Sequence, residues 1–150
     1  MKRIFFLVLI AMTMSLALVS CGGSGSSSEN NAILSDITTE YLKIIQKGDC
    51  EKLWDFMIEY SDMIPQDAKE EEIEIMKSAA IEACKLAQEE ILESKEGIKN
   101  FKIEKEEISA NGMTATVYAT ITIESGSTHT STIRYKKVDG KWQYNGEEIE

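Results

Sequence analysis

The pattern of apolar and polar positions changes twice along the chain. Residues 4–19 are apolar apart from a few Thr and Ser side chains. From about residue 33 to residue 97, apolar residues recur every three or four positions, which is the period of an amphipathic helix. From Phe101 onward they alternate with polar residues, which is the period of a half-buried strand. The pattern predicts helices first and an antiparallel sheet second, an α+β order.

Two short helices are predicted at the start of this region. Ser35 or Asp36 is placed to cap the first helix, and Gly48 is placed to end it. Asp49 follows directly and can cap the second helix through its side chain. The apolar positions of both helices fall on one side, so each is expected to pack against the sheet.

The third predicted helix has the most regular pattern. It is expected to begin at a capping-box sequence over residues 67–70, with Asp67 in the capping position, and to end at Gly97. One stripe carries its apolar residues, which are Ile73, Met76, Ala80, Ala83, Ala87 and Ile91. The small alanines in the middle of the stripe allow close packing on a neighbouring element.

Turn sequences divide the rest of the chain into strands. The first strand is predicted over residues 101–107 and is followed by Asn-Gly at 111–112, a strong hairpin signal. The second covers 113–124 and alternates apolar residues with threonines. Asp-Gly at 139–140 precedes a short last strand over 141–144. We therefore expect N-terminal helices packed on one face of a curved four-stranded antiparallel meander.

The N-terminal apolar run has the form of a signal peptide. Lys2 and Arg3 precede it, and it is shorter than the roughly 20 residues that a membrane-spanning helix needs. The run ends in Leu18, Val19, Ser20 and Cys21, which resembles the lipobox of bacterial lipoproteins. That resemblance implies that Cys21 carries the lipid anchor, diacylglycerol and palmitate, and becomes the mature N-terminus.

These features divide the chain into three parts. Residues 1–20 are the lipoprotein signal peptide, 21–32 are the lipidated cysteine with a flexible linker, and 33–150 are the α+β domain. The Gly, Ser and Asn residues of the linker give it a root-mean-square span of about 17–19 Å. We expect the protein to be held at a bacterial membrane by its N-terminal lipid, outside the cytoplasm, in either the inner or the outer membrane.

The net charge and the composition of the chain argue against two classes of function. The formal charge is −10, so the surface repels phosphate backbones and nucleic-acid binding is not expected. A single His excludes a His-cluster metal site, and we expect no metal and no cofactor.

Cys50 and Cys84 remain once Cys21 is assigned to the lipid. In an oxidising compartment two such thiols can form a disulfide, here closing a loop that would stabilise the fold by about 3.5–4 kcal/mol. The alternative is two separate buried thiols that behave as small apolar residues.

Three local sequences resemble the nuclear transport factor 2-like superfamily, also described as cystatin-like in small bacterial lipoproteins. They are Tyr-Leu-Lys at 41–43 ahead of Lys-Gly-Asp and Leu-Trp, the strand sequence 111–117, and Val-Asp-Gly-Lys-Trp at 138–142. Together they cover roughly residues 33–146. The resemblance implies a cone-shaped fold, in which a curved sheet wraps around a helix to form an apolar pocket, and frequent dimerisation through the outer face of the sheet.

Candidate pocket residues follow from that expected cone. Tyr41, Trp54, Met57, Ile58 and Phe101 could line the mouth of the pocket, although residues at helical spacing are more often core. A pocket enzyme would pair an acid with a hydroxyl donor, and Tyr41 with Asp55 is the pair available on the first two helices. We favour solvated helix surface as the interpretation of Asp55.

The polar face of the second strand is a candidate interface. It consists of Thr114, Thr116, Thr120 and Thr122, with Tyr118 among them. Such a face can be exposed to solvent or can pack on a second sheet, so we predict a possible homodimer through it.

These observations favour a lipid-anchored extracytoplasmic binding or interaction module without catalysis. The alternatives are a small pocket enzyme of the isomerase or dehydratase type, or a structural envelope protein that acts through the threonine face. Fold alone does not decide between them.

Overall fold

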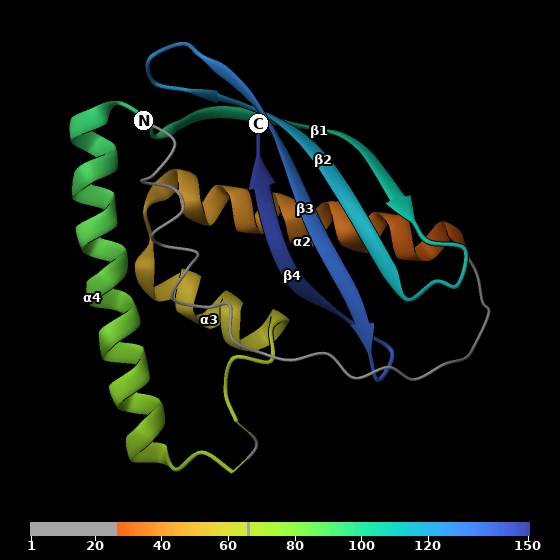
Figure 1. Ribbon diagram of the computed structural model, residues 1–150, viewed down its shortest axis with the longest axis horizontal. Coiled ribbons are helices and arrows are strands. Elements are labelled where there is room, and N and C mark those ends of the chain that lie inside the picture. The colour runs from red at the N-terminus through yellow and green to blue at the C-terminus, as the bar shows by residue number, and fades with distance from the viewer. Residues whose placement is uncertain (1–26, 66) are drawn as a thin grey trace.

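The computed structural model describes residues 27–65 and 67–150, and over that range it shows helices followed by strands (Figure 1). The predicted signal peptide, Cys21 and the first part of the linker lie outside the described residues. The elements are α2 (Ser27–Lys47), α3 (Cys50–Tyr60), α4 (Glu70–Ser94), β1 (Ile98–Ile108), β2 (Thr114–Ile123), β3 (Thr128–Val138) and β4 (Lys141–Ile149). No helix in this part of the chain is both long and apolar enough to cross a membrane.

The four strands form one antiparallel sheet in the order β1-β2-β3-β4. The curved sheet lies across α2, which runs along its inner face, and α3 lies beside β4 (Figure 1). This is the predicted fold class, and it is confirmed. The turn at residues 111–112 joins β1 to β2 as the Asn-Gly sequence predicts.

The core lies between α2 and the inner face of the sheet. Leu34 and Leu42 on α2 are fully buried, and they pack in one cluster with Val117 and Ile133 from the two central strands. The alternation of β2 places its apolar residues inward, because successive strand side chains point to opposite faces. The core residues are therefore those that the helical and strand periodicities place on the apolar faces of the elements.

The first helix begins earlier than predicted. α2 starts at Ser27, upstream of the predicted caps Ser35 and Asp36, and so overlaps the end of the predicted linker. Ser35 instead lies inside the helix, where its hydroxyl donates a hydrogen bond to the Glu106 side chain. A Ser inside a helix can therefore resemble a capping residue in the sequence while its side chain bonds to a distant strand.

The turn between α2 and α3 follows the prediction. Gly48 comes directly after α2 with a positive φ of 64°, and a Cβ there would lie 2.9 Å from Oε1 of Gln88 on α4. The positive φ is what favours glycine here, because the end of the flexible Gln88 side chain can move away from an added Cβ. Asp49 caps α3 by accepting the N–H of Lys52 at 3.2 Å.

The ends of α4 differ from the prediction. The helix begins at Glu70, and the Glu72 carboxylate accepts the Lys69 N–H at 3.0 Å, so Asp67 is not the cap. The helix ends at Ser94, where Lys95 adopts a left-handed conformation with a φ of 56°, before the predicted stop at Gly97. The sequence does not indicate that a lysine, rather than a glycine, takes the left-handed conformation that ends this helix.

The position of α4 also differs from the prediction. It packs chiefly against α3 and stands apart from the sheet, at the left of Figure 1. Cys84 is its buried residue, whereas Ala83 of the predicted stripe is exposed. The expectation that all the helices cover the sheet is therefore wrong for α4.

Candidate functional site

Two β-bulges turn carboxylates toward the interior of the fold. In β4 the register shifts between the pairs Tyr135–Tyr144 and Ile133–Glu147, so that Tyr144 and Glu147 face the same side. In β1 a similar shift after Ile103 places Glu106 opposite the buried Val117. An extra residue in one strand changes which face the following side chains occupy. The bulges are thus the reason that acidic residues lie under the sheet.

Glu147 is held by hydroxyl groups from two other elements. Tyr41 on α2 donates to Oε2 of Glu147 over 2.8 Å, and the Ser131 hydroxyl on β3 donates to its other oxygen. Burial raises the pKa of Glu147 above its ordinary value, while the two hydrogen bonds lower it in part. Burial is therefore the largest influence on this carboxyl group, and two hydroxyl donors hold it in place.

Aromatic rings surround this carboxyl group. The ring centroids of Tyr41 and Tyr144 lie 5.3 Å apart, and those of Tyr144 and Tyr135 lie 6.4 Å apart in an edge-to-face arrangement. Burial and the nearby Glu147 raise the pKa of Tyr41 and of Tyr144. Burial also raises the pKa of Tyr135. These phenols therefore stay protonated, and Tyr41 uses its proton to donate to Glu147.

A second set of contacts lies further along α2. Thr38 and Tyr135 hydrogen-bond through their hydroxyl groups over 2.8 Å, and Ser35 contacts Glu106. The second carboxylate oxygen of Glu106 is buried without a hydrogen-bond partner in the described part of the chain. We call this arrangement the polar seam; its members are Ser35, Thr38, Tyr41, Glu106, Ser131, Tyr135, Tyr144 and Glu147.

The predicted pocket residues are divided between core and surface. Tyr41, Trp54 and Met57 are buried, Phe101 is partly buried against the core, and 41% of Ile58 is exposed. Asp55 is exposed on α3, as its favoured interpretation as helix surface predicts, and the acid that Tyr41 contacts is Glu147.

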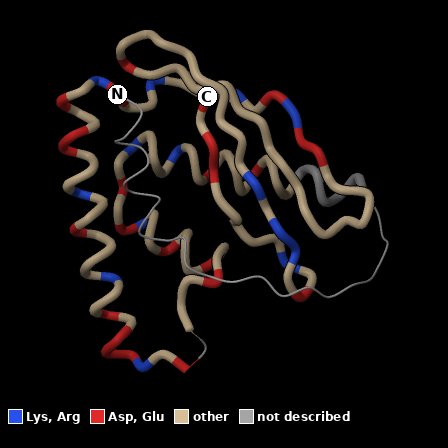
Figure 2. The backbone as a smooth tube through the Cα atoms, viewed as in Figure 1, with Lys and Arg blue, Asp and Glu red and all other residues tan. Residues whose placement is uncertain are grey.

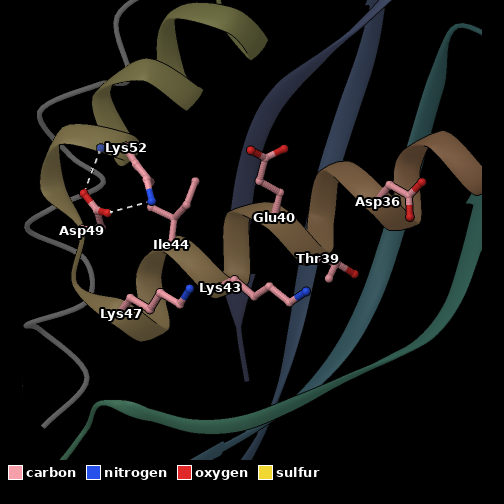
Figure 3. A pocket seen from close by; sticks show the side chains of 8 residues that line it. All are labelled: Asp36, Thr39, Glu40, Lys43, Ile44, Lys47, Asp49 and Lys52. Atoms are coloured by element: carbon pink, nitrogen blue, oxygen red, sulfur yellow. Dashed lines mark hydrogen bonds and ion pairs between the residues drawn. The ribbon is translucent and has the colours of Figure 1, made fainter.

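Two surface depressions are found elsewhere on the described chain. One, of about 360 Å³, lies over the outer side of α2 and the start of α3 (Figure 3). Its lining is mostly charged, and within it Asp49 and Lys52 form an ion pair of 3.4 Å. The other, of about 490 Å³, lies beside Thr114 and Glu107 at the end of the β1–β2 hairpin. Neither is lined by the predicted pocket residues.

A disulfide joins Cys50 to Cys84, with their Cα atoms 5.8 Å apart. Cys50 is the first residue of α3, and Cys84 lies in the middle of α4. The bond therefore fastens the middle of α4 to the start of α3. Within the described residues, no group of three or more His, Cys, Asp or Glu side chains is placed to hold a metal ion.

The threonine face of β2 is partly covered by charged side chains of β1. Thr120 donates to Glu104 at 2.9 Å, and Tyr118 donates to Glu107 at 3.1 Å. The Lys105 ammonium lies 4.3 Å from the centre of the Tyr118 ring. A homodimer through Thr114, Thr116, Thr120 and Thr122 stays a prediction, and it would have to accommodate these charges.

Sequence reasoning missed the acidic members of the polar seam. The last strand was predicted to end at residue 144, whereas β4 continues through Gly146, whose φ is 113°. A glycine within a strand pattern is a signal for a bulge. The Asn-Gly pair after Tyr144 could therefore have indicated that Glu147 points inward.

Comparison with known proteins agrees with this architecture. A crystal structure described as an NTF2-like transpeptidase from Campylobacter jejuni has a TM-score of 0.50 and 17% identity, and the match covers 74% of this chain and 95% of that chain. The intermembrane-space region of the chloroplast protein ARC6 has a TM-score of 0.43 and 12% identity, with coverage of 79% and 95%. A DUF4783 family protein from Bacteroides fragilis has a TM-score of 0.40 and 13% identity, with coverage of 73% and 93%.

The sequence itself matches one family model. No curated protein matches it significantly. Residues 19–145, most of the chain, match a domain of unknown function called DUF4878. The chain therefore belongs to the DUF4878 family, and its domain has the NTF2-like fold.

Proposed function

We propose that this protein is a lipid-anchored, extracytoplasmic interaction module that works without catalysis. Its location is supported by two independent features of the chain. The lipobox sequence ending in Cys21 resembles that of bacterial lipoproteins. The disulfide between Cys50 and Cys84 is of the kind that persists in oxidising compartments.

The outer side of α4 carries the interaction part of the proposal. Ile75 and Leu86 are 70% and 60% exposed, although both are large apolar residues. Exposed apolar residues that gather on one element are typical of a protein–protein contact surface. The helix itself is fastened to α3 by the disulfide, so it presents these side chains from a fixed position.

Fatty-acid labelling in a bacterial host tests the anchoring part. The chain should incorporate an alkyne-labelled palmitate and fractionate with membranes, and Cys21→Ser should lose both properties. A variant with Cys50→Ser and Cys84→Ser is the matched control, because it removes two thiols and leaves the lipobox unchanged. Label that survives Cys21→Ser would disprove a lipid on that residue.

A pocket enzyme is the second candidate, favoured by one observation. Glu147 combines a raised pKa with a hydrogen bond from Tyr41, which is the pairing that acid–base chemistry uses. Native mass spectrometry of gently purified protein tests it. A small molecule that co-purifies with the protein and is lost in Glu147→Gln would support this candidate over the interaction module.

A further inference from the structure

We propose that the outward face of α4 binds a basic amphipathic helix of a protein partner. This inference rests on the proposed function, because it names the class of partner that the interaction module would bind. It is carried by the spacing of the exposed apolar residues, by the charges around them and by the way α4 is held.

The apolar residues on the outside of α4 form a line. Ile75, Ala79 and Leu86 are separated by four and seven residues, so they lie on one side of the helix, and all three are exposed. We call these three residues the outward stripe. Cys84 and the half-buried Ile73, Ala80, Ala87 and Ile91 lie on the opposite side, toward α3. The helix thus has a second apolar line that the described chain leaves uncovered.

Acidic residues flank the outward stripe. α4 contains eight glutamates and two lysines, and Figure 2 shows the acidic positions along its whole length. Helical spacing places Glu71, Glu82, Glu89 and Glu93 on the same side as the outward stripe. Lys77, in contrast, is half-buried on the side of Cys84, and Lys85 is the one exposed lysine of α4, beside Glu82 and Glu89. The exposed apolar line therefore runs through a negative surface.

These carboxylates are not neutralised within the domain. None of the ion pairs formed by the described residues involves a glutamate of α4. Their negative charge is therefore available to a cationic partner, and complementary charge favours encounter and orientation of two surfaces.

The same charges argue against two other occupants. Anionic lipid headgroups would be repelled by the glutamates around the outward stripe. In a second copy of this chain, α4 against α4 would bring two acidic helices together, and like charges across an interface are unfavourable. A helix with lysines or arginines around an apolar line satisfies both the stripe and the glutamates.

Three synthetic 18-residue peptides test the inference against the purified full chain. The first is a helix with leucines on one side and lysines on the other. The second has glutamates in place of the lysines, and the third has serines in place of the leucines. Binding is measured by fluorescence anisotropy at about 50 mM and about 300 mM salt, since the higher salt shortens the range of charge interactions.

Matched variants locate the binding surface. The pair Ile75→Ser with Leu86→Ser is expected to weaken binding of the Lys-Leu peptide about tenfold. The pair Glu82→Gln with Glu89→Gln is expected to weaken it about threefold. The controls are Ile33→Ser with Ile58→Ser, exposed apolar residues on α2 and α3, and Glu51→Gln with Glu124→Gln, exposed acids on α3 and after β2. Circular dichroism should show that all four variants keep their helix content.

The inference stands if the Lys-Leu peptide binds, if both α4 variants weaken it and if neither control does. Equal binding of the Glu-Leu peptide would overturn the proposal of a basic partner, and equal loss in the control variants would remove α4 as the site.

Binding to phosphatidylglycerol vesicles that depends on Ile75 and Leu86 would assign the face to a membrane. A mass that doubles through the same residues would assign it to a second copy. A missing lipid on Cys21 would contradict the anchoring proposal and leave this result unaffected.

Discussion

Tyr41 donates a hydrogen bond to Glu147 over 2.8 Å, although 106 positions separate the two residues in the sequence. The contact joins the first described helix to the last strand of the sheet. It exists because the bulge at Gly146 turns Glu147 inward, and because Tyr41 lies one turn of α2 beyond Thr38, on the same face. The last strand is thereby connected to the core by a polar contact as well as by packing.

Substitution of Glu147 by Gln should change how stability depends on pH. The pKa of Glu147 is raised in the folded protein, so the native state holds its proton to higher pH than the unfolded chain does. Unfolding free energy should therefore be highest below the ordinary glutamate pKa and should fall as pH rises through the raised native pKa. Glutamine does not titrate and should lack this fall.

The measurement is urea unfolding of both proteins between about pH 4 and pH 8. Tyr41, Tyr135 and Tyr144 face the carboxyl group, and their phenols stay protonated throughout this range. Glu148→Gln is the control, because Glu148 is exposed and pairs with Arg134 on the outer face. A wild-type advantage over Glu147→Gln that grew with pH would contradict the assigned direction.

Substitution of Gly146 by Ala should destabilise the fold. Gly146 has a φ of 113°, which a residue with a Cβ rarely adopts, so the variant should lose about 1–3 kcal/mol. The loss arises from the backbone, since a Cβ at this position meets nothing within 4 Å. Gly97→Ala is the matched control, because its added Cβ has only ordinary contacts at 3.5 Å. Thermal unfolding of the two variants separates strain from a general effect of removing glycine.

Reduction of the disulfide should lower the unfolding free energy. The bond closes a loop of sequence separation 34, which corresponds to about 3.5–4 kcal/mol in the chain-entropy treatment. The same loss is expected in a variant with Cys50→Ser and Cys84→Ser, measured by urea unfolding. The two forms should agree, and adding reductant to the double variant should have no effect. A double variant as stable as the oxidised protein would show that packing on α3 alone holds α4.

The threonine face is expected to mediate a homodimer in solution. Sedimentation equilibrium should give twice the chain mass, and Thr120→Lys should return it to one chain because a new charge would enter the contact. Ser78→Lys is the control, since Ser78 is exposed on α4, away from the sheet. A mass of one chain at every concentration would exclude this interface.

Periodicity predicted most of the fold, because its elements are amphipathic in the ordinary way. The alternation in β2, the Asn-Gly turn and the Asp49 cap each report a local preference that the tertiary structure keeps. The spacing of apolar residues does not show which element an apolar helix face packs against. The apolar stripe of α4 was correctly placed on a helix, but nothing in its spacing distinguishes packing on α3 from packing on the sheet.

The candidate site was harder to predict for a related reason. Alternation assigns a residue to the inner or outer face only while the register is unbroken, and each bulge reverses the assignment. Glu106 and Glu147 both follow such a break. The hydroxyls of Thr38 and Tyr41 lie on a face that is otherwise apolar, and helical spacing does not indicate which strand residues they contact.

The bond between Cys50 and Cys84 also makes the segment from α3 to the middle of α4 a closed covalent ring. A protease that cut the connection between Tyr60 and Glu70 would open the ring without releasing a fragment. The two pieces would migrate together until a reductant separated them. If the chain is anchored at Cys21 as proposed, a protein cleaved there would keep its sheet at the membrane only while the disulfide stays oxidised.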